Sequence, residues 1–484
     1  MIGPMFAWGL VAAWVVVTQT AAGPPAPQLT PAALLKLGTA LEAKNDLAGA
    51  ADAYDRAVRA APDNAIARDK LGFVLGRLGR TEDALAEFSR AAALDPSLFD
   101  AQYHLGATRW WTRDFAGAET ALRAAVRLRP RHPEARYYLG VTLKQLGRPE
   151  EGVAELREAL RINPALAPAH LQLGVALQTQ GDLDGAIAHL RRAVDLDGGS
   201  ADSLNSLGLA LMQKGEGKQA AEIFRRIAAS HPDFPTARLN LATALMHQGD
   251  LAGAVQVLQR LTADEPRNAE AFYNLGVALK QQDRFEPAEA ALRRAVALGP
   301  QLPDPPFTLG VVLWQTGRVE EAATFFREAI ARKPQSAEAH YMLGTVLKQL
   351  SRPDQAIEEF RAALRADPDL AEAHLSLAQA LHQKGDADGA RKARAEADRL
   401  SQRKADAQAS AFALSVGQQR LKAGDRSGAI AQFREAIRLA PDNAQAHFAL
   451  ALALEQAGAA AEARRHFDEA RRLAPHLKRP ESGR

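Results

Sequence analysis

Histidines are the residues of this chain best suited to acid–base or metal chemistry, and their spacing argues against both. His170, His340, His374 and His447 lie multiples of 34 residues apart once a five-residue insertion is allowed for. Residues that recur with a structural period belong to the framework of a repeat. The sequence also contains no cysteine and no HExxH, GxSxG, P-loop or GxGxxG pattern. We therefore predict no catalytic, cofactor-binding or metal-binding residues, and no enzyme activity.

A second set of residues is suited to binding a partner. Aromatic and lysine side chains recur in pairs seven residues apart, which places both members on one face of a helix. The pairs are Tyr103 with Trp110, Tyr137 with Lys144, Tyr273 with Lys280, Phe307 with Trp314, and Tyr341 with Lys348. Rings supply apolar contact area at low entropic cost, and neighbouring glutamines supply amide groups for a peptide backbone. We predict that these residues line a partner-binding groove; the alternative is that the rings only pack between neighbouring helices.

The elements that must position these pairs follow from a period of 34 residues. A Leu-Gly or Leu-Ala pair recurs at this spacing from residue 37 to residue 377, and the register resumes five residues late at residue 416. Thirteen units of 34 residues result, from 31–64 to 444–477. A period of this length is typical of stacked helical units, none of which can bury its apolar face alone.

Within each unit, small, large and helix-breaking residues recur at fixed positions. The twentieth position is Ala in twelve units and Gly152 in the other, which allows two antiparallel helices to approach closely. A large apolar residue follows four positions later in most units, and Pro at the thirty-second position of eleven units ends the second helix. The sequence therefore predicts two helices per unit.

This pattern resembles the tetratricopeptide repeat over residues 31–477. The resemblance implies an all-α fold, an α-solenoid of helix-turn-helix units in a right-handed superhelix, whose first helices line a concave groove that binds proteins or peptides. Some family members grip a carboxylate with Lys and Asn at the fifth and ninth positions, and this chain departs from that pattern. Asn240 and Asn274 are similar to the asparagine ladder of O-linked N-acetylglucosamine transferases, but two rungs are too few to carry that function over.

The N-terminal sequence is typical of an export signal. No charged residue precedes Lys36, and an apolar run from Met5 to Val17 is followed by small residues and prolines. We predict cleavage after about Ala22 and a periplasmic or secreted protein. An uncleaved membrane anchor and a mis-assigned start codon are the alternatives.

The predicted organisation is a single repeat array with one interruption. Its segments are a signal peptide (1–22), a Pro-rich linker (23–30), units one to eleven (31–404), an insertion within an extended helical connector (405–409), units twelve and thirteen (410–477) and a basic tail (478–484). Two departures lie inside the array. Gly198-Gly199 marks either a bend or a Gly-rich version of the usual turn, and Pro305-Pro306 predicts that the first helix of unit nine begins about a turn late.

These observations predict a non-catalytic scaffold that binds extended protein segments, in a bacterial cell envelope. The alternative is an accessory arm that presents substrates to a separately encoded enzyme such as a glycosyltransferase. A nucleic-acid partner is disfavoured because 60 basic residues face 57 acidic ones, a net charge of +3. We expect the patch in units eight to ten to contribute most to binding, because a late helix start would expose Phe307 and Trp314.

Overall fold

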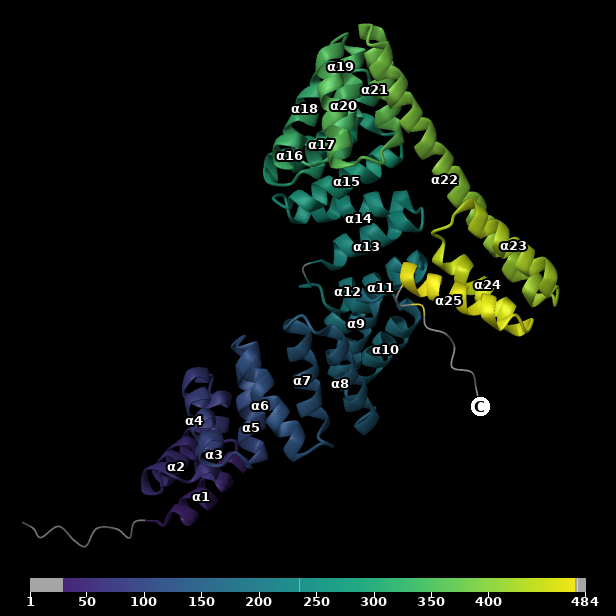
Figure 1. Ribbon diagram of the computed structural model, residues 1–484. Coiled ribbons are helices and arrows are strands. Elements are labelled where there is room, and N and C mark those ends of the chain that lie inside the picture. The colour runs from purple at the N-terminus through teal and green to yellow at the C-terminus, as the bar shows by residue number, and fades with distance from the viewer. Residues whose placement is uncertain (1–28, 235, 475–476, 478–484) are drawn as a thin grey trace, which may run out of the picture. The chain divides into compact units, whose positions relative to one another are not determined.

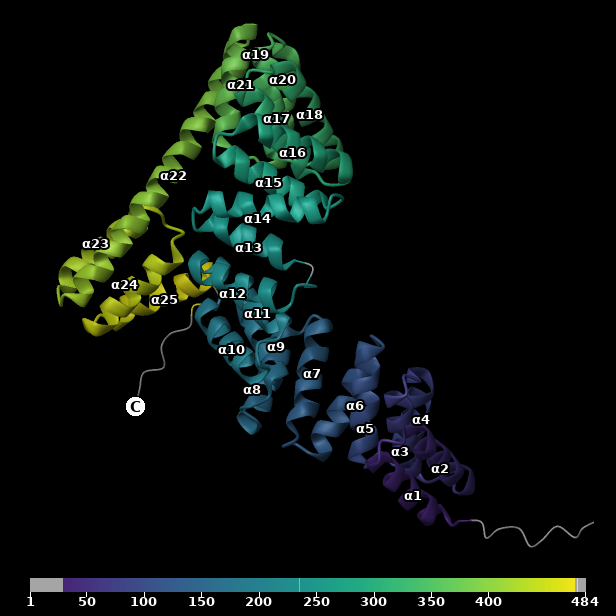
Figure 2. The same ribbon diagram turned by 180° about the vertical axis from the view of Figure 1, so that it is seen from behind.

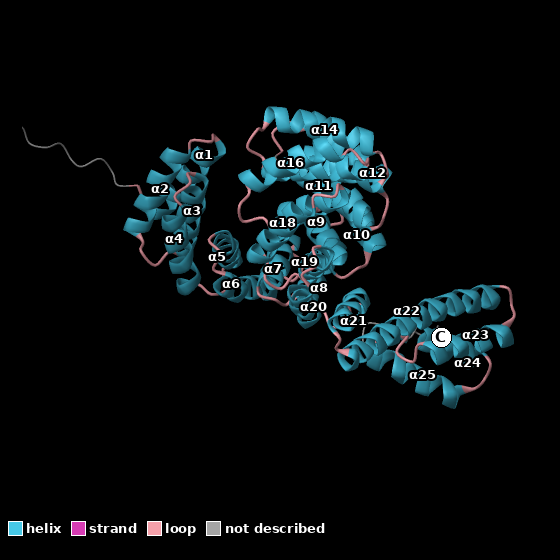
Figure 3. Cartoon of the chain, turned by 90° about the horizontal axis from the view of Figure 1, so that it is seen from above, coloured by secondary structure: helices cyan, strands magenta, loops and turns pink. Residues whose placement is uncertain are grey.

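The computed structural model describes residues 29–234, 236–474 and 477, all of them in helices, turns or loops (Figure 3). The predicted signal peptide and basic tail, and all but the last two residues of the linker, lie outside this part. Among the described residues there are twenty-five helices and no strand, as the all-α prediction requires. None of these helices is both long enough and apolar enough to cross a membrane.

The helices fall into two compact units, Met1–Phe234 and Pro235–Arg484. The first unit contains α1 (Pro31–Ala43), α2 (Leu47–Ala60), α3 (Ala65–Arg77), α4 (Thr81–Leu94), α5 (Phe99–Trp111), α6 (Phe115–Leu128), α7 (Pro133–Gln145), α8 (Pro149–Ile162), α9 (Ala167–Thr179), α10 (Leu183–Leu196), α11 (Ala201–Gln213) and α12 (Gly217–Ser230). Each odd-numbered helix packs against the even-numbered helix that follows it and, less extensively, against the one before it (Figure 1).

The second compact unit continues the same alternation as far as α21. It contains α13 (Ala237–His247), α14 (Leu251–Asp264), α15 (Ala269–Gln281), α16 (Phe285–Leu298), α17 (Asp304–Gln315), α18 (Val319–Arg332), α19 (Ala337–Gln349), α20 (Pro353–Ala366), α21 (Ala371–Lys384), α22 (Ala387–Lys422), α23 (Arg426–Leu439), α24 (Ala444–Gln456) and α25 (Ala460–Leu473). Within each compact unit the chain is therefore an α-solenoid, built from the helix pairs that the period predicts.

The helices of a pair fit together by a glycine set against a large side chain. Gly310 in α17 faces Phe326 in α18, and a Cβ atom on the glycine would lie 2.8 Å from the Phe326 ring. Gly106 and Leu122 make the same fit between α5 and α6, where the distance would be 2.5 Å. Because Phe326 and Leu122 are fully buried, the eighth and twenty-fourth positions of the repeat form the centre of each pair.

The first helix of unit nine does not begin a turn late, so that prediction is wrong. Helix α17 begins at Asp304, one residue into its unit, and both Pro305 and Pro306 lie buried in its first turn. Proline is tolerated there because the first N–H groups of a helix have no acceptor within the helix. No gap therefore precedes Phe307.

The Gly198-Gly199 pair forms a turn between α10 and α11. Both glycines have positive φ angles, 72° and 83°, and Asp197 accepts hydrogen bonds of 3.0 Å from the backbone N–H groups of Gly199 and Ser200. Helices α10 and α11 pack side by side like the corresponding helices of other units. Of the two interpretations, the structure supports the Gly-rich version of the usual turn.

One helix replaces three expected segments near the C-terminus. Helix α22 runs unbroken from Ala387 to Lys422, through the second helix of unit eleven, the insertion and the first helix of unit twelve. Figures 1 and 2 show it packed on α21 near its start and on α23 near its end. Ser410, where we expected a new pair to begin, is therefore an interior residue of a helix.

Candidate partner-binding surface

The ten predicted groove residues lie on first helices and are all half-buried. Tyr103, Trp110, Tyr137 and Lys144 lie on α5 and α7 and form what we call the first patch. The second patch consists of Tyr273, Lys280, Phe307, Trp314, Tyr341 and Lys348, on α15, α17 and α19. Their rings pack against the cores of the helix pairs and also keep exposed surface. The packing alternative therefore accounts for only part of each ring.

Tyr138 is the centre of the first patch, and the sequence analysis missed it. Its ring contacts Tyr103, Trp110 and Tyr137, with centroids 6.1, 5.8 and 5.1 Å away, all in edge-to-face geometry. Such contacts stabilise aromatic clusters beyond the area that they bury. Tyr138 occupies the sixth position of its unit and lies outside the seven-residue spacing that we searched. The only sign of it in the sequence was the concentration of aromatic residues in this segment.

Burial changes the acid–base properties of the first patch. It raises the pKa of Tyr137 to about 12, with a smaller contribution from Tyr138, and it raises the pKa of Tyr103. Burial also lowers the pKa of Lys144, whose ammonium group donates to the backbone oxygen and to the side-chain oxygen of Gln172, at 3.2 and 3.0 Å. Among the described residues no carboxylate forms an ion pair with Lys144. A desolvated cation without a counter-ion therefore lies in this patch.

In the second patch, glutamines of the following unit accept hydrogen bonds from the tryptophan and from one lysine. Trp314 donates from Nε1 to Oε1 of Gln349 at 3.1 Å, and Lys348 donates from Nζ to Oε1 of Gln379 at 2.9 Å. The ring of Phe307 lies tilted against the buried Phe326 ring, with centroids 5.8 Å apart. The bonds from one first helix to the next fix the direction in which each amide group points.

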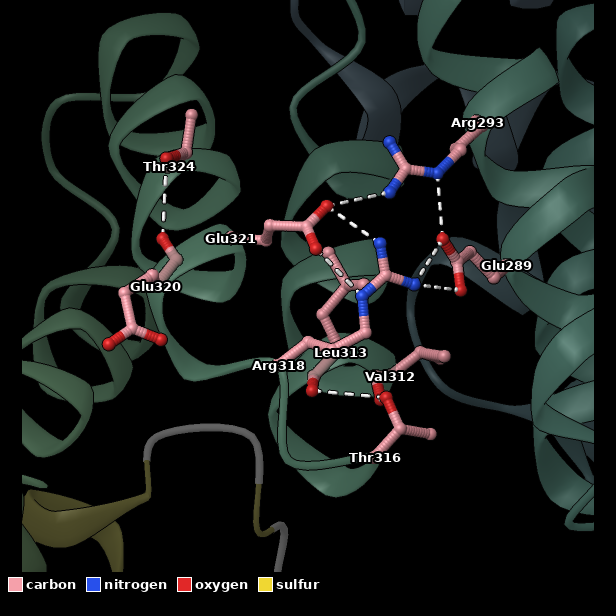
Figure 4. Close-up of polar contacts among 9 residues, drawn as sticks. All are labelled: Glu289, Arg293, Val312, Leu313, Thr316, Arg318, Glu320, Glu321 and Thr324. Carbon is pink, nitrogen blue, oxygen red and sulfur yellow. Dashed lines mark hydrogen bonds and ion pairs between the residues drawn. The ribbon is translucent and has the colours of Figure 1, made fainter.

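An ion-pair network on the second helices holds units eight and nine together beside this patch. Figure 4 shows Arg318 bonded to Glu289 of the preceding unit and to Glu321 of its own, while Arg293 also reaches both carboxylates. Burial by itself would raise the pKa of Glu289, but the hydrogen bonds from Arg293 and Arg318 outweigh it and lower that pKa. The same network of two arginines and two glutamates joins units three and four, which carry the first patch. Its members are Glu119, Arg123, Arg148 and Glu151. Both patches thus lie where neighbouring units are tied together.

The recurring histidines are framework residues. His170 lies with its Nε2 3.1 Å from the carbonyl oxygen of Pro164, at the end of the preceding second helix, and His340 and His447 make the same contact with Pro334 and Pro441. The carbonyl oxygen can only accept, so Nε2 of His170 donates. Burial favours the neutral ring, in which Nδ1 then accepts from Nδ1 of His189, 2.9 Å away.

We expect acid to destabilise unit five. Burial lowers the pKa of both His170 and His189, so their neutral forms stabilise the fold above the ordinary histidine pKa of about 6.5, and this stabilisation is lost as the pH falls below it. We expect amide hydrogen exchange in α9 and α10 to accelerate between about pH 7 and pH 5. His189→Glu should abolish the acceleration, because a carboxylate accepts a hydrogen bond from Nδ1 and stabilises the protonated ring; Glu359 holds this position 2.6 Å from Nδ1 of His340 in unit ten. Equal acceleration in the variant would contradict the assignment.

The family follows from the repeats themselves. Two family models, each described as a tetratricopeptide repeat, match the chain: one at residues 211–275, 245–308 and 279–346, the other at 20–65, 108–167, 147–201, 171–233, 341–408 and 417–477. The second alone matches more than half of the chain. The chain is a tetratricopeptide repeat protein. Repeats of this family typically form protein-interaction surfaces.

Solved structures of tetratricopeptide repeat proteins resemble parts of this chain. MamA is 25% identical over 34% of this chain and 96% of its own, with a TM-score of 0.33. YrrB, described as having an unusual peptide-binding site, is 26% identical over 39% of this chain and 96% of its own, with a TM-score of 0.34. The Cut9–Hcn1 complex overlaps 92% of this chain at 15% identity and a TM-score of 0.34. No curated protein matches the chain.

The described residues also offer no obvious site for a metal ion. Within residues 29–234 and 236–474, no group of three or more His, Asp or Glu side chains comes together in a way that would hold one. What the geometry does offer is two half-buried patches of rings and amino groups on the first helices of a tetratricopeptide repeat array.

Proposed function

We propose that this protein is a non-catalytic scaffold that binds extended segments of other proteins along its first helices. The observation that carries the proposal is the second patch, where three successive first helices present half-buried rings beside oriented amide groups. Rings supply most of the free energy in such interfaces, and oriented amides pair with a peptide backbone at little further entropic cost.

We also propose that the scaffold acts in the bacterial cell envelope. The apolar run before Ala22 and the prolines after it support export. Mass spectrometry of the protein from its native host tests the location: a mature N-terminus near residue 23 is expected, and an intact Met1 in the cytoplasmic fraction would reject it.

Trp314→Ala tests the binding proposal. Truncating a partly buried interface tryptophan commonly costs about 2 kcal/mol, so affinity for a captured partner should fall roughly thirtyfold. The partner is first isolated by affinity purification from native extracts, and its dissociation constant is then measured for the wild type and the variant. Helicity by circular dichroism should not change.

The Trp314→Ala experiment has a control variant and an outcome that would contradict it. Phe412→Ala removes a ring that is 72% exposed and lies outside both patches, so it should leave the affinity unchanged. Undiminished binding by a folded double variant, Trp314→Ala with Tyr341→Ala, would show that the rings of the second patch serve packing alone. Co-purification of an enzyme whose activity depends on this chain would instead favour the substrate-presenting arm.

A further inference from the structure

Lys144 is the polar residue of the first patch whose environment is least explained by packing. The residue is half-buried, burial lowers the pKa of its ammonium group, and that group's hydrogen bonds go to Gln172 and not to a carboxylate. A desolvated cation with neutral partners is costly for the free protein. That cost falls if a partner brings a negative charge.

Gly152 lies directly against the stem of this lysine. Every other unit has Ala at the twentieth position. At Gly152 a Cβ atom would lie 2.9 Å from Cγ of Lys144 and 2.7 Å from the backbone oxygen of Gly140, both closer than real Cβ contacts. The missing side chain thus makes room for the lysine stem. Lys280 and Lys348 hold the same position opposite Ala288 and Ala356, so the glycine belongs to the close packing of α7 on α8 and is not required by a lysine there.

Trp110 adds a donor without an acceptor. In the second patch, Trp314 donates to a glutamine 35 residues later, and the corresponding residue for Trp110 is Gln145. Yet Nε1 of Trp110 is buried, and within the described chain it has no hydrogen-bond partner. Both patches have the tryptophan and the glutamine, but the indole donor is satisfied in one and has no partner in the other. An unsatisfied buried donor costs about 1–3 kcal/mol.

A partner can reach this buried donor only after a neighbouring side chain moves. Trp111 is 69% exposed, and its ring stands edge-on to Trp110 with centroids 5.1 Å apart. Exposed side chains change rotamer within nanoseconds. Trp111 is the exposed neighbour, and its indole face lies beside Trp110, where it could receive an apolar side chain of the partner.

We propose that the first patch recognises a side-chain carboxylate of an extended partner segment, with Lys144 supplying the positive charge and Trp110 the hydrogen bond. This inference rests on the proposed function and names the partner's chemistry. Charge complementarity selects an Asp or Glu, because one ammonium group and one neutral donor match a single negative charge. A phosphate group, with up to two charges, usually requires several cations or an Arg fork.

The test compares peptides that differ in one charge. The probes are extended peptides of about twelve residues, long enough to cross four first helices at roughly 10 Å each. Each has a central Glu, random flanking residues and blocked ends, which remove the terminal carboxylate, and each has a twin with Gln at the centre. The best Glu probes should bind the full-length protein about tenfold more tightly than their Gln twins.

Substitutions then assign the preference to the site. Lys144→Met keeps the stem beside Gly152 but removes the charge, so the tenfold ratio should fall to about one. Trp110→Phe keeps a ring and removes the unsatisfied donor, so the ratio should fall while thermal stability does not. Lys218→Gln, on the exposed face of a second helix, is the matched control and should retain the full ratio.

Three results would overturn the inference. Glu probes and Gln twins that bind the wild type equally would show that no charge is read. A full preference retained by a folded Lys144→Met variant would place the recognition elsewhere. Tighter binding of phosphoserine twins would assign the site to phosphate. If no peptide of any kind binds, the proposed function fails with the inference, whereas peptide binding without a Glu preference removes the inference alone.

Discussion

Phe326→Ala should lower the free energy of unfolding of unit nine and its neighbours by about 3–5 kcal/mol. The ring is fully buried between α17 and α18, and Gly310 lies directly against it. A glycine has no side chain that could move into the vacated space, so the cavity would remain open. This is the condition under which large-to-small substitutions cost most.

The loss should be local because each unit of a solenoid contacts only its neighbours. Hydrogen exchange should accelerate most in α16 to α19, and helices of the other compact unit should be unaffected. Phe412→Ala is the matched control: Phe412 is 72% exposed, so its removal should cost less than about 0.5 kcal/mol. Equal destabilisation by the two substitutions would show that the glycine–aromatic fit does not govern stability.

The fit between helices was predictable from the sequence because it is steric and recurs in twelve of the thirteen units. A small residue at the twentieth position and a large one at the twenty-fourth specify the pairing of two helices without reference to anything else in the chain. The same reasoning identified the recurring histidines as framework, which their bonds to proline carbonyl groups explain.

The predictions that failed concerned places where one unit meets another or where a helix begins. Pro305 and Pro306 were expected to delay α17, but a helix tolerates proline throughout its first turn. Tyr138 was missed because its ring bridges α5 and α7, a relation that spacing within one helix does not encode. The bond from Trp314 to Gln349 likewise depends on the distance between units, whereas the identical residues of the first patch do not form it. The same Trp and Gln pair therefore gave two different sites, because its neighbours differ: Trp111 and Tyr138 correspond to Gln315 and Met342.

Helix α22 raises the question whether units twelve and thirteen belong to the same stack as the units before them. The outer face of a second helix normally receives the next first helix through its twenty-first and twenty-eighth positions, which in unit ten are Ile357 and Leu364. In unit eleven these positions are Arg391 and Asp398, both exposed. The final unit has exposed arginines at both positions, so unit eleven has the surface of a terminal unit.

The N-terminal face of unit twelve agrees with this interpretation. Its third position is Phe412, mostly exposed, where other units have a small residue that packs on the preceding helix. Units twelve and thirteen also have a core of their own, centred on Phe433 and Leu450. The array therefore ends at unit eleven, and α22 links it to a second, shorter solenoid.

Ala405→Pro should break α22 without unfolding what lies on either side. Proline in a helix interior removes a hydrogen bond and clashes with the preceding turn, at a cost of about 3 kcal/mol or more. Ala405 is exposed and lies between the segments that pack on α21 and α23. Amides around residues 401–409 should exchange rapidly and become sensitive to protease, while those of α21 and α24 keep their protection.

Ala405→Ser is the control, since it changes an exposed helix position by only a few tenths of a kcal/mol. If Ala405→Pro melted α23 to α25 together with the break, the second solenoid would depend on α22 for its fold. If the variant buried Phe412 and protected it from solvent, units eleven and twelve would be stacking directly. That second outcome would require Arg391 and Asp398 to lose water beneath a helix, and burial of such charges with imperfect partners costs several kcal/mol. The charges on unit eleven therefore disfavour direct stacking of units eleven and twelve, whether or not the helix between them is intact.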